Sequence, residues 1–419
     1  MLDFVDVVTY ESVKTTLCQG PSHENNSDRC LVYLILAIGL AFDSYPRERG
    51  LQDPNLKELF FANAEALLPP IENGRGLEKD VPWTLQALIL MSFYMLCVSR
   101  PHTARSYCVR AIEVAYAFGI HQGKETEIDD SPSTKAWRVS RRNAWRGLFV
   151  LDRFIAATLG RPLIIHQRTE ESLKAQKSTS LSAAVDACRI IGETIKALYS
   201  ESRTPMEKVK STVGHLDSLI RAERKQAPFM AQGHIRSLRI YADILLCRPF
   251  FLLRFMSSAA EREILDCNEP QINELSQRCV SESIQAVYMV KEGTSSAFSP
   301  LHIDPFVTYA LTEAAYVLLC SIYADIHVGE ENLSLANDAI DILMTADETN
   351  SYAKHSASVL ASFLHDVKCR VNARIIKPKL EKHAYRTKTE PNMAYESSQY
   401  RSPFPPVTQS SHNVDKLND

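Results

Sequence analysis

Hydrophobic residues recur along most of this chain three and four positions apart, so that they share one face of an α-helix. Runs of β-branched residues that alternate with polar ones are short, so we predict essentially no sheet. The predicted fold class is therefore all-α, a large irregular helical bundle built from antiparallel helix hairpins. The pattern predicts helices over residues 29–43, 55–68, 82–98, 101–118, 134–159, 181–200, 206–225, 230–256, 268–292, 304–326, 331–346 and 350–373.

The stretch from residue 83 to residue 162 defines its helices most sharply. Residues 83–96 are apolar almost all round, which is typical of a helix enclosed by other helices. Pro101 suits the first turn of the next helix, because its missing N–H needs no partner there. Gly119 is expected to end that second helix. Small side chains along it favour a close approach of two helix backbones, and they are Ala104, Cys108, Ala111 and Ala115.

A third helix of this stretch is predicted to begin after Asp129-Asp130 and to end at Gly160 and Pro162. We interpret the two aspartates as caps of the helix start. The apolar stripe of this helix consists of Trp145, Leu148, Phe149, Ile155 and Leu159. The residue patterns of these three helices indicate how they pack and point to no catalytic site.

These helices also carry a series of ordered motifs. The motifs are Leu85-Gln86-Ala87-Leu88, Arg100-Pro101, Gly119-Ile120-His121, Arg141-Arg142, Trp145, Leu148 to Arg153, and Gly160-Arg161-Pro162. In order and spacing they resemble the regulatory middle homology domain of fungal zinc binuclear cluster transcription factors. Weaker similarity at residues 30–42, 245–252 and 304–319 extends the resemblance over most of the chain.

The chain departs from that family in two respects. The family often carries two adjacent tryptophans where this chain has Trp145-Arg146, so conserved core packing is not expected there. The family's zinc cluster needs six cysteines with two Cys-x-x-Cys pairs, and this chain has none, its closest cysteines being Cys97 and Cys108. The resemblance begins near residue 30, so we expect direct DNA contact to be absent from this chain.

Composition narrows the class of protein further. The formal net charge of −3 over 419 residues offers no general cationic surface for DNA or an anionic membrane. The first residues lack the basic start of a secretory signal, and the longest apolar run, 31–42, is too short to cross a bilayer. We therefore expect an intracellular protein without a membrane partner. Its ten cysteines are then interpreted as small core residues and not as disulfides.

Four segments are predicted along the chain. Residues 1–166 form the N-terminal helical half, and residues 183–373 form the C-terminal helical half. The polar stretch 167–182 is interpreted as an exposed connection between them. Residues 374–419 form a basic exit and a disordered tail, in which prolines and serines leave too little apolar content to offset the cost of ordering.

An all-helical enzyme of the terpene synthase type is one alternative, because such enzymes bind magnesium diphosphate through aspartate-rich helices. Asp129-Asp130 invites this reading. However, Ser133 stands where a third carboxylate is expected, and Pro132 would break the helix that aligns the ligands. The candidate for a second metal site is Asn337-Asp338, followed by Asp341 and Thr345 where Ser and Glu are expected.

Other polar residues favour structural roles. Asp152 and Arg153 adjoin an apolar stripe, so we expect them to form buried or half-buried bonds that fix helix packing. An arginine cluster is expected to pair with carboxylates or to face solvent, and it comprises Arg138, Arg141, Arg142 and Arg146. A diluted basic run is either a nuclear import signal or a solvated helix end, and it comprises Lys368, Arg370, Arg374, Lys377, Lys379 and Lys382.

We therefore predict no catalytic, cofactor-binding, metal or DNA-binding residues in this chain, no cofactor and no enzyme activity. The resemblance implies a nuclear regulator of RNA polymerase II transcription with an effector or partner bound among the helices. That partner would be the transcription machinery or a DNA-bound protein, and a homodimer is compatible with the pattern. Either the chain acts at this length through a DNA-bound partner, or an upstream exon with the zinc cluster is missing from the gene model. A non-catalytic helical scaffold is the remaining alternative.

Overall fold

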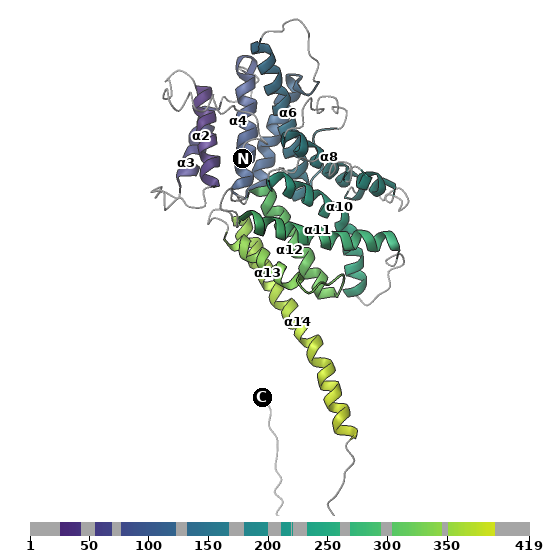
Figure 1. Cartoon of the computed structure of the whole chain (residues 1–419). Helices are drawn as coiled ribbons and strands as arrows, with labels where there is room; N and C mark the ends of the chain where they lie inside the picture. The colour runs from purple at the N-terminus through teal and green to yellow at the C-terminus, as the bar shows by residue number, and fades with distance from the viewer. Residues whose placement is uncertain are drawn as a thin grey trace, which may run out of the picture. The chain divides into compact units, whose positions relative to one another are not determined.

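The computed structural model of this chain describes residues 26–42, 55–68, 77–122, 132–166, 180–199, 211–218, 220, 233–259, 269–294, 304–345 and 351–389. Every regular element among these residues is helical and none is a strand, which confirms the all-α prediction. The helices are α2 (Asn26–Ala41), α3 (Leu56–Leu67), α4 (Leu77–Cys97), α5 (Pro101–Ala117), α6 (Pro132–Leu159), α8 (Ser180–Leu198), α10 (Gly233–Ala259), α11 (Pro270–Thr294), α12 (Pro305–Ala324), α13 (Asn332–Met344) and α14 (Ser351–Thr389), with the short 3-10 helix η3 (Ile120–Gln122) after α5 (Figure 1).

One predicted helix ends much later in the structure than expected. The helix predicted over 350–373 continues to Thr389, well past its expected end. The added residues include four lysines and two arginines, which are strong helix formers. Of the predicted basic exit and disordered tail, 374–419, residues 390–419 lie outside the described residues. The same holds for most of the predicted helix 206–225, of which residues 211–218 and 220 are helical.

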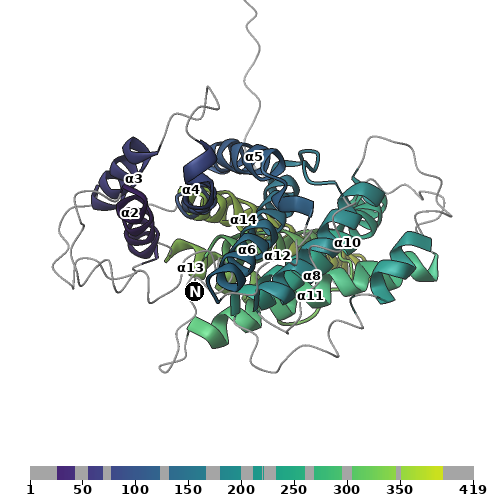
Figure 2. The same cartoon turned by 90° about the horizontal axis from the view of Figure 1, so that it is seen from above.

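The chain divides into two compact units, Met1–Val371 and Asn372–Asp419. In the second unit the described residues are the end of α14. In the first unit, helices that are consecutive in sequence pack as pairs, namely α2 with α3, α4 with α5, α10 with α11 and α12 with α13. The helix α6 packs against α4 and α5 on one side and against α8 on another, and α8 in turn packs against α10 (Figures 1 and 2).

The α4–α5 pair forms as its sequence predicts. The four small residues of the α5 seam are buried, and the Ser92 hydroxyl of α4 donates to the Ala104 carbonyl of α5 at 2.8 Å. Such a bond requires close backbones, which the small side chains permit. Pro101 begins α5, and Gly119 follows its end with a φ of 63°. Gly119 thus provides the left-handed residue expected at a helix end.

Three other helices end on a left-handed residue followed by an N–H that reaches back five positions. The pairs are Arg100 N to Met95 O at 2.7 Å after α4, Arg161 N to Ala156 O at 3.0 Å after α6, and Ile326 N to Ser321 O at 2.9 Å after α12. The left-handed residues are Ser99, Gly160 and Asp325, with φ values of 61°, 61° and 60°. These bonds satisfy carbonyls that a helix end otherwise leaves without partners.

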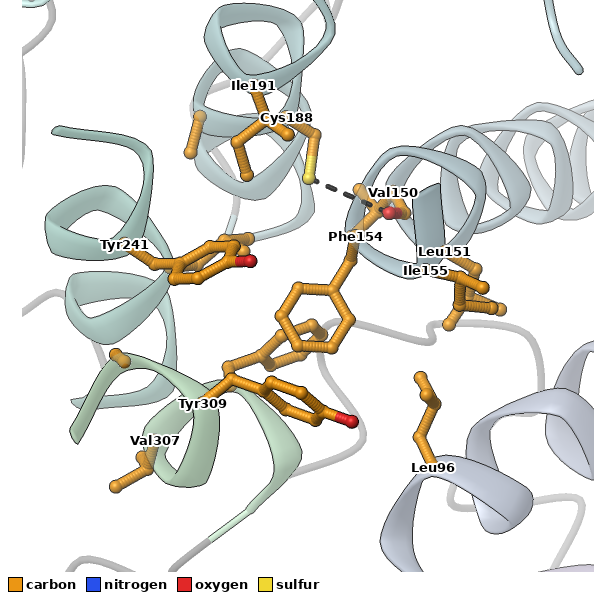
Figure 3. Close-up of a cluster of buried hydrophobic side chains, with 14 of the residues drawn as sticks. Leu96, Val150, Leu151, Phe154, Ile155, Cys188, Ile191, Tyr241, Val307 and Tyr309 are labelled. Carbon is orange, nitrogen blue, oxygen red and sulfur yellow. Dashed lines mark hydrogen bonds between the residues drawn. The ribbon is translucent and has the colours of Figure 1, made fainter. Parts of the chain in front are cut away.

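Phe154 of α6 lies at the centre of the hydrophobic core. Its ring meets Phe306 at 4.6 Å, Tyr309 at 5.5 Å and Tyr241 at 5.8 Å between centroids, each in an edge-to-face arrangement. Figure 3 shows side chains of α4, α6, α8, α10 and α12 gathered around it, including Leu96. This aromatic cluster therefore joins helices from both predicted halves.

Replacement of Phe154 with alanine should remove that central contact. We expect a loss of about 3–5 kcal/mol in the free energy of unfolding, because a fully buried ring leaves a cavity. Urea denaturation of the full chain measures it. Leu59→Ala, an apolar truncation at a side chain that is 53% exposed, is the matched control and should cost less than about 1 kcal/mol. Equal losses in both variants would contradict this central role.

Asp304 caps the start of α12 and makes stability depend on pH. Its carboxylate accepts from Val307 N at 2.8 Å, and burial raises the pKa of Asp304 to about 7. Between about pH 4 and pH 7 the folded chain therefore keeps a proton that the unfolded chain releases. The contribution of Asp304 to stability should fall as pH rises through this window, by up to about 4 kcal/mol.

Asp304→Asn keeps an oxygen for Val307 N but cannot ionise, so it should flatten this part of the pH profile. Denaturation of both proteins from pH 4 to pH 8 measures the difference. The same change at the exposed Asp325 is the control and should leave the profile unchanged. A constant difference between wild type and Asp304→Asn across the range would refute the assignment.

Candidate functional site

The densest polar structure in the described core is built on Asp152 and Arg153 of α6. Both side chains are almost completely buried, and Arg153 Nη1 donates to Asp152 Oδ2 at 2.7 Å. The guanidinium carbon also lies 3.8 Å from the centroid of the Phe149 ring, one turn earlier on the helix. A charge pair in such a position needs further hydrogen bonds to offset its lost hydration.

The segment after α6 supplies those bonds. The N–H of Ile164 donates to both Asp152 oxygens at 3.1 and 3.2 Å, and the N–H of Ile165 donates to Oδ2 at 3.1 Å. Arg153 Nη2 donates to the Ile165 carbonyl at 2.8 Å. The pair thus holds the returning backbone from both sides, and we refer to Asp152, Arg153, Ile164 and Ile165 as the clamp.

Two residues that no sequence pattern singled out support the same segment. Arg105 of α5 donates from Nη2 to the Pro162 carbonyl at 3.0 Å. The N–H of His166 donates to the hydroxyl of Tyr116, also on α5. Gly160, which is left-handed, and Pro162 give the chain the turn that brings this segment back along α6. The Gly-Arg-Pro motif therefore ends α6 at a point from which the following backbone can bond to the buried charges of Asp152 and Arg153.

Electrostatics agree with a structural role for the clamp. Burial raises the pKa of Asp152, against the opposing effects of the Arg153 charge and the two N–H groups. Burial likewise lowers the pKa of Arg153, against the attraction of Asp152. Both groups are closed off from solvent, and their hydrogen bonds run to each other and to the backbone of Ile164 and Ile165. The expectation of buried bonds that fix packing is confirmed.

The helix α8 covers the other side of the clamp. A Cβ added at Gly192 would lie 3.4 Å from both Cγ and Nε of Arg153, so the glycine marks a close approach of the two helices. One turn earlier, the Cys188 thiol donates to the Val150 carbonyl at 3.7 Å (Figure 3). Most described cysteines are buried and none of them forms a disulfide, as predicted.

Arg146 of the arginine cluster and its neighbour Trp145 lie in the packed interior, whereas Arg138, Arg141 and Arg142 are half-buried. Trp145 is fully buried, with its ring centroid 5.6 Å from that of Tyr116. The adjacent Arg146 is buried as well, and the charge of Asp186 on α8 raises its pKa against the larger lowering by burial. Arg141 donates to the Phe118 carbonyl at 3.5 Å. Burial and the nearby Arg142 charge lower the pKa of Arg146 while Asp186 opposes them, so for this one arginine the structure is compatible with the ion-pairing alternative.

The aspartates that suggested a magnesium enzyme do not converge where they are described. Asn337 Nδ2 donates to Asp341 Oδ2 at 2.8 Å along α13, and Asp338 accepts from Lys291 Nζ of α11 at 2.6 Å. Asp129 and Asp130 lie outside the described residues. Within the described part of the chain, no group of three or more His, Cys, Asp or Glu side chains could hold a metal ion.

One described helix, Pro305–Ala324, is long and apolar enough to cross a membrane by length and composition. Its apolar window is 78% buried among the other helices. The core helix of a folded bundle meets the same criteria, and α12 packs against α10, α11 and α13.

With this geometry in view, comparison with known proteins identifies the family. The fungal specific transcription factor domain matches residues 6–224, more than half of the chain. The chain belongs to this family of fungal transcription factors, as its motifs indicated. A family of transcription factors implies a nuclear role and no catalysis, which confirms the prediction that the chain is not an enzyme.

Two curated relatives extend the similarity. An uncharacterized transcriptional regulatory protein of Schizosaccharomyces pombe is 24% identical over 365 residues, covering 80% of this chain and 43% of that protein. Filamentous growth regulator 27 of Candida albicans is 21% identical over 353 residues, covering 76% of this chain and 43% of that protein. The chain thus spans less than half the length of these relatives.

Asp152→Asn tests the clamp. The amide keeps the shape of the carboxyl group but leaves the buried Arg153 charge without its counter-ion, so we expect a loss of about 3–5 kcal/mol in the free energy of unfolding. Glu193→Gln breaks the Lys196–Glu193 pair, whose side chains are 39% and 29% exposed, and should cost less than about 1 kcal/mol. Guanidinium denaturation measures both. A loss below about 1 kcal/mol for Asp152→Asn would show that the clamp does not stabilise the fold.

Proposed function

We propose that this chain is the regulatory domain of a nuclear regulator of RNA polymerase II transcription, which acts through an effector or partner bound by its helices. The family match over residues 6–224 is the observation that supports this most directly. The curated relative from Schizosaccharomyces pombe carries the name of a transcriptional regulatory protein, which supports the same role. The partner we propose is the transcription machinery or a DNA-bound protein.

The architecture is compatible with control by binding and not by chemistry. The clamp and the Phe154 cluster link α6 to α8, α10 and α12, so a ligand that changes one helix pair would affect its neighbours. Zinc-cluster cysteines do not occur in the chain, so the proposal places DNA contact in a separate segment or protein. A small-molecule effector and self-association as a homodimer are part of the proposal.

A reporter assay tests this function. The full chain, fused to a foreign DNA-binding domain, should change transcription of a reporter that carries the matching DNA site, and a fluorescent version should gather in the nucleus. The foreign domain alone is the baseline. Phe154→Ala should abolish the change by unfolding the regulatory domain, whereas Leu59→Ala should retain it. A fusion that is abundant, folded and nuclear but leaves transcription at baseline would refute the proposal.

A further inference from the structure

Pro249 lies inside α10 and interrupts its hydrogen bonding. In an α-helix, the N–H at this position would donate to the carbonyl four residues earlier, which is that of Leu245. Proline has no N–H, and its ring pushes against that same carbonyl. Nevertheless α10 runs without a break from Gly233 to Ala259. The Leu245 carbonyl therefore needs another donor.

Tyr199, which follows the last residue of α8, supplies that donor. Its hydroxyl donates to the Leu245 carbonyl at 2.8 Å. Burial raises the pKa of Tyr199 to about 12, so the hydroxyl keeps the proton that it donates. The side chain of one helix end thus replaces the backbone bond that Pro249 removes from another helix.

Arg248 holds this tyrosine in place and extends the contact to a third helix. Its Nε donates to the Tyr199 hydroxyl at 3.2 Å, and its guanidinium lies 5.3 Å from the centroid of the tyrosine ring. Its Nη1 donates to Glu313 Oε2 of α12 at 2.8 Å. Burial alone would lower the pKa of Arg248, but Glu313 and Tyr199 outweigh it and raise the pKa, so the arginine stays charged.

The contact of Tyr199 with Leu245 and Arg248 joins α8 to α10 next to two other features. The same helix α8 that ends at Tyr199 packs its Gly192 against Arg153 of the clamp. After Pro249, α10 carries Leu252 and Met256, which are 42% and 58% exposed. Tyr199 thus contacts α10 at Leu245 and at Arg248, the latter one helical turn before the exposed Leu252.

We propose that Tyr199 is a latch, a conformational device by which the end of α8 closes the break that Pro249 makes in α10. When the hydroxyl leaves the Leu245 carbonyl, the joint between α8 and α10 opens locally while the rest of the bundle stays folded. Two features allow such an opening: Tyr199 is partly exposed, and Pro249 leaves no backbone bond to resist it.

Hydrogen exchange of the full-length chain tests the latch. Tyr199→Phe removes the hydroxyl that donates to Leu245 and accepts from Arg248. We expect amide exchange in residues 250–253 to rise roughly five- to tenfold, the effect of losing about one net hydrogen bond at the Leu245 carbonyl. Exchange in α4 and α5 should not change. Tyr288→Phe is the matched control, because it removes a tyrosine hydroxyl that donates to Glu331 far along the chain from Pro249.

A double-mutant comparison distinguishes the latch from ordinary packing. Pro249→Ala restores an N–H that can donate to Leu245, so Tyr199→Phe should raise exchange less than twofold in that background. Tyr288→Phe should have the same effect with either residue at 249. Equal increases for Tyr199→Phe in both backgrounds, or no increase in the Pro249 background, would overturn the proposal. Circular dichroism of each variant checks that the bundle is still folded.

Discussion

The fold of this chain depends on how it accommodates two opposite charges inside a hydrophobic core. Asp152 and Arg153 are adjacent on α6, and a buried pair of this kind is tolerated only when its remaining donors and acceptors are satisfied. The backbone at Ile164 and Ile165 supplies hydrogen bonds to both charged groups. This requirement explains why α6 must end when it does and why the chain then turns back along the helix. A helix that continued past Gly160 would leave both charges without their hydrogen bonds to the backbone of Ile164 and Ile165.

The same region determines how the rest of the first unit is assembled. One face of α6 presents Phe154 to α10 and α12, while the clamp meets α8 through Gly192. At its other end α8 reaches α10 through Tyr199. α6 and α8 thus provide part of the contacts between helices distant in sequence, in addition to direct ones such as that between α10 and α12. Under the proposed function, this arrangement is a physical route by which binding at one helix pair would influence another.

Much of this architecture could be predicted from residue spacing, and the exceptions share a physical reason. Apolar periodicity predicted the helices, and Gly119 and Gly160 predicted two of their ends. Ser99 and Asp325 adopt the same left-handed conformation. Neither serine nor aspartate predicts that conformation from sequence as glycine does. The role of Asp152 and Arg153 followed from their place beside an apolar stripe. Arg105, Tyr116 and Tyr199 could not be predicted, because each acts on a backbone carbonyl or N–H distant in sequence, and no local pattern records such a contact.

The central claim is that the returning backbone is locked to the buried charges for as long as the core is folded. Native-state amide exchange at Ile164 and Ile165, followed by NMR in the full chain with increasing denaturant, tests it most directly. The account predicts that both amides exchange only through global unfolding, with the same free energy and denaturant dependence as the most protected core amides. Rapid exchange at these two positions, independent of denaturant, would mean that the segment opens while the core stays intact, and would contradict it.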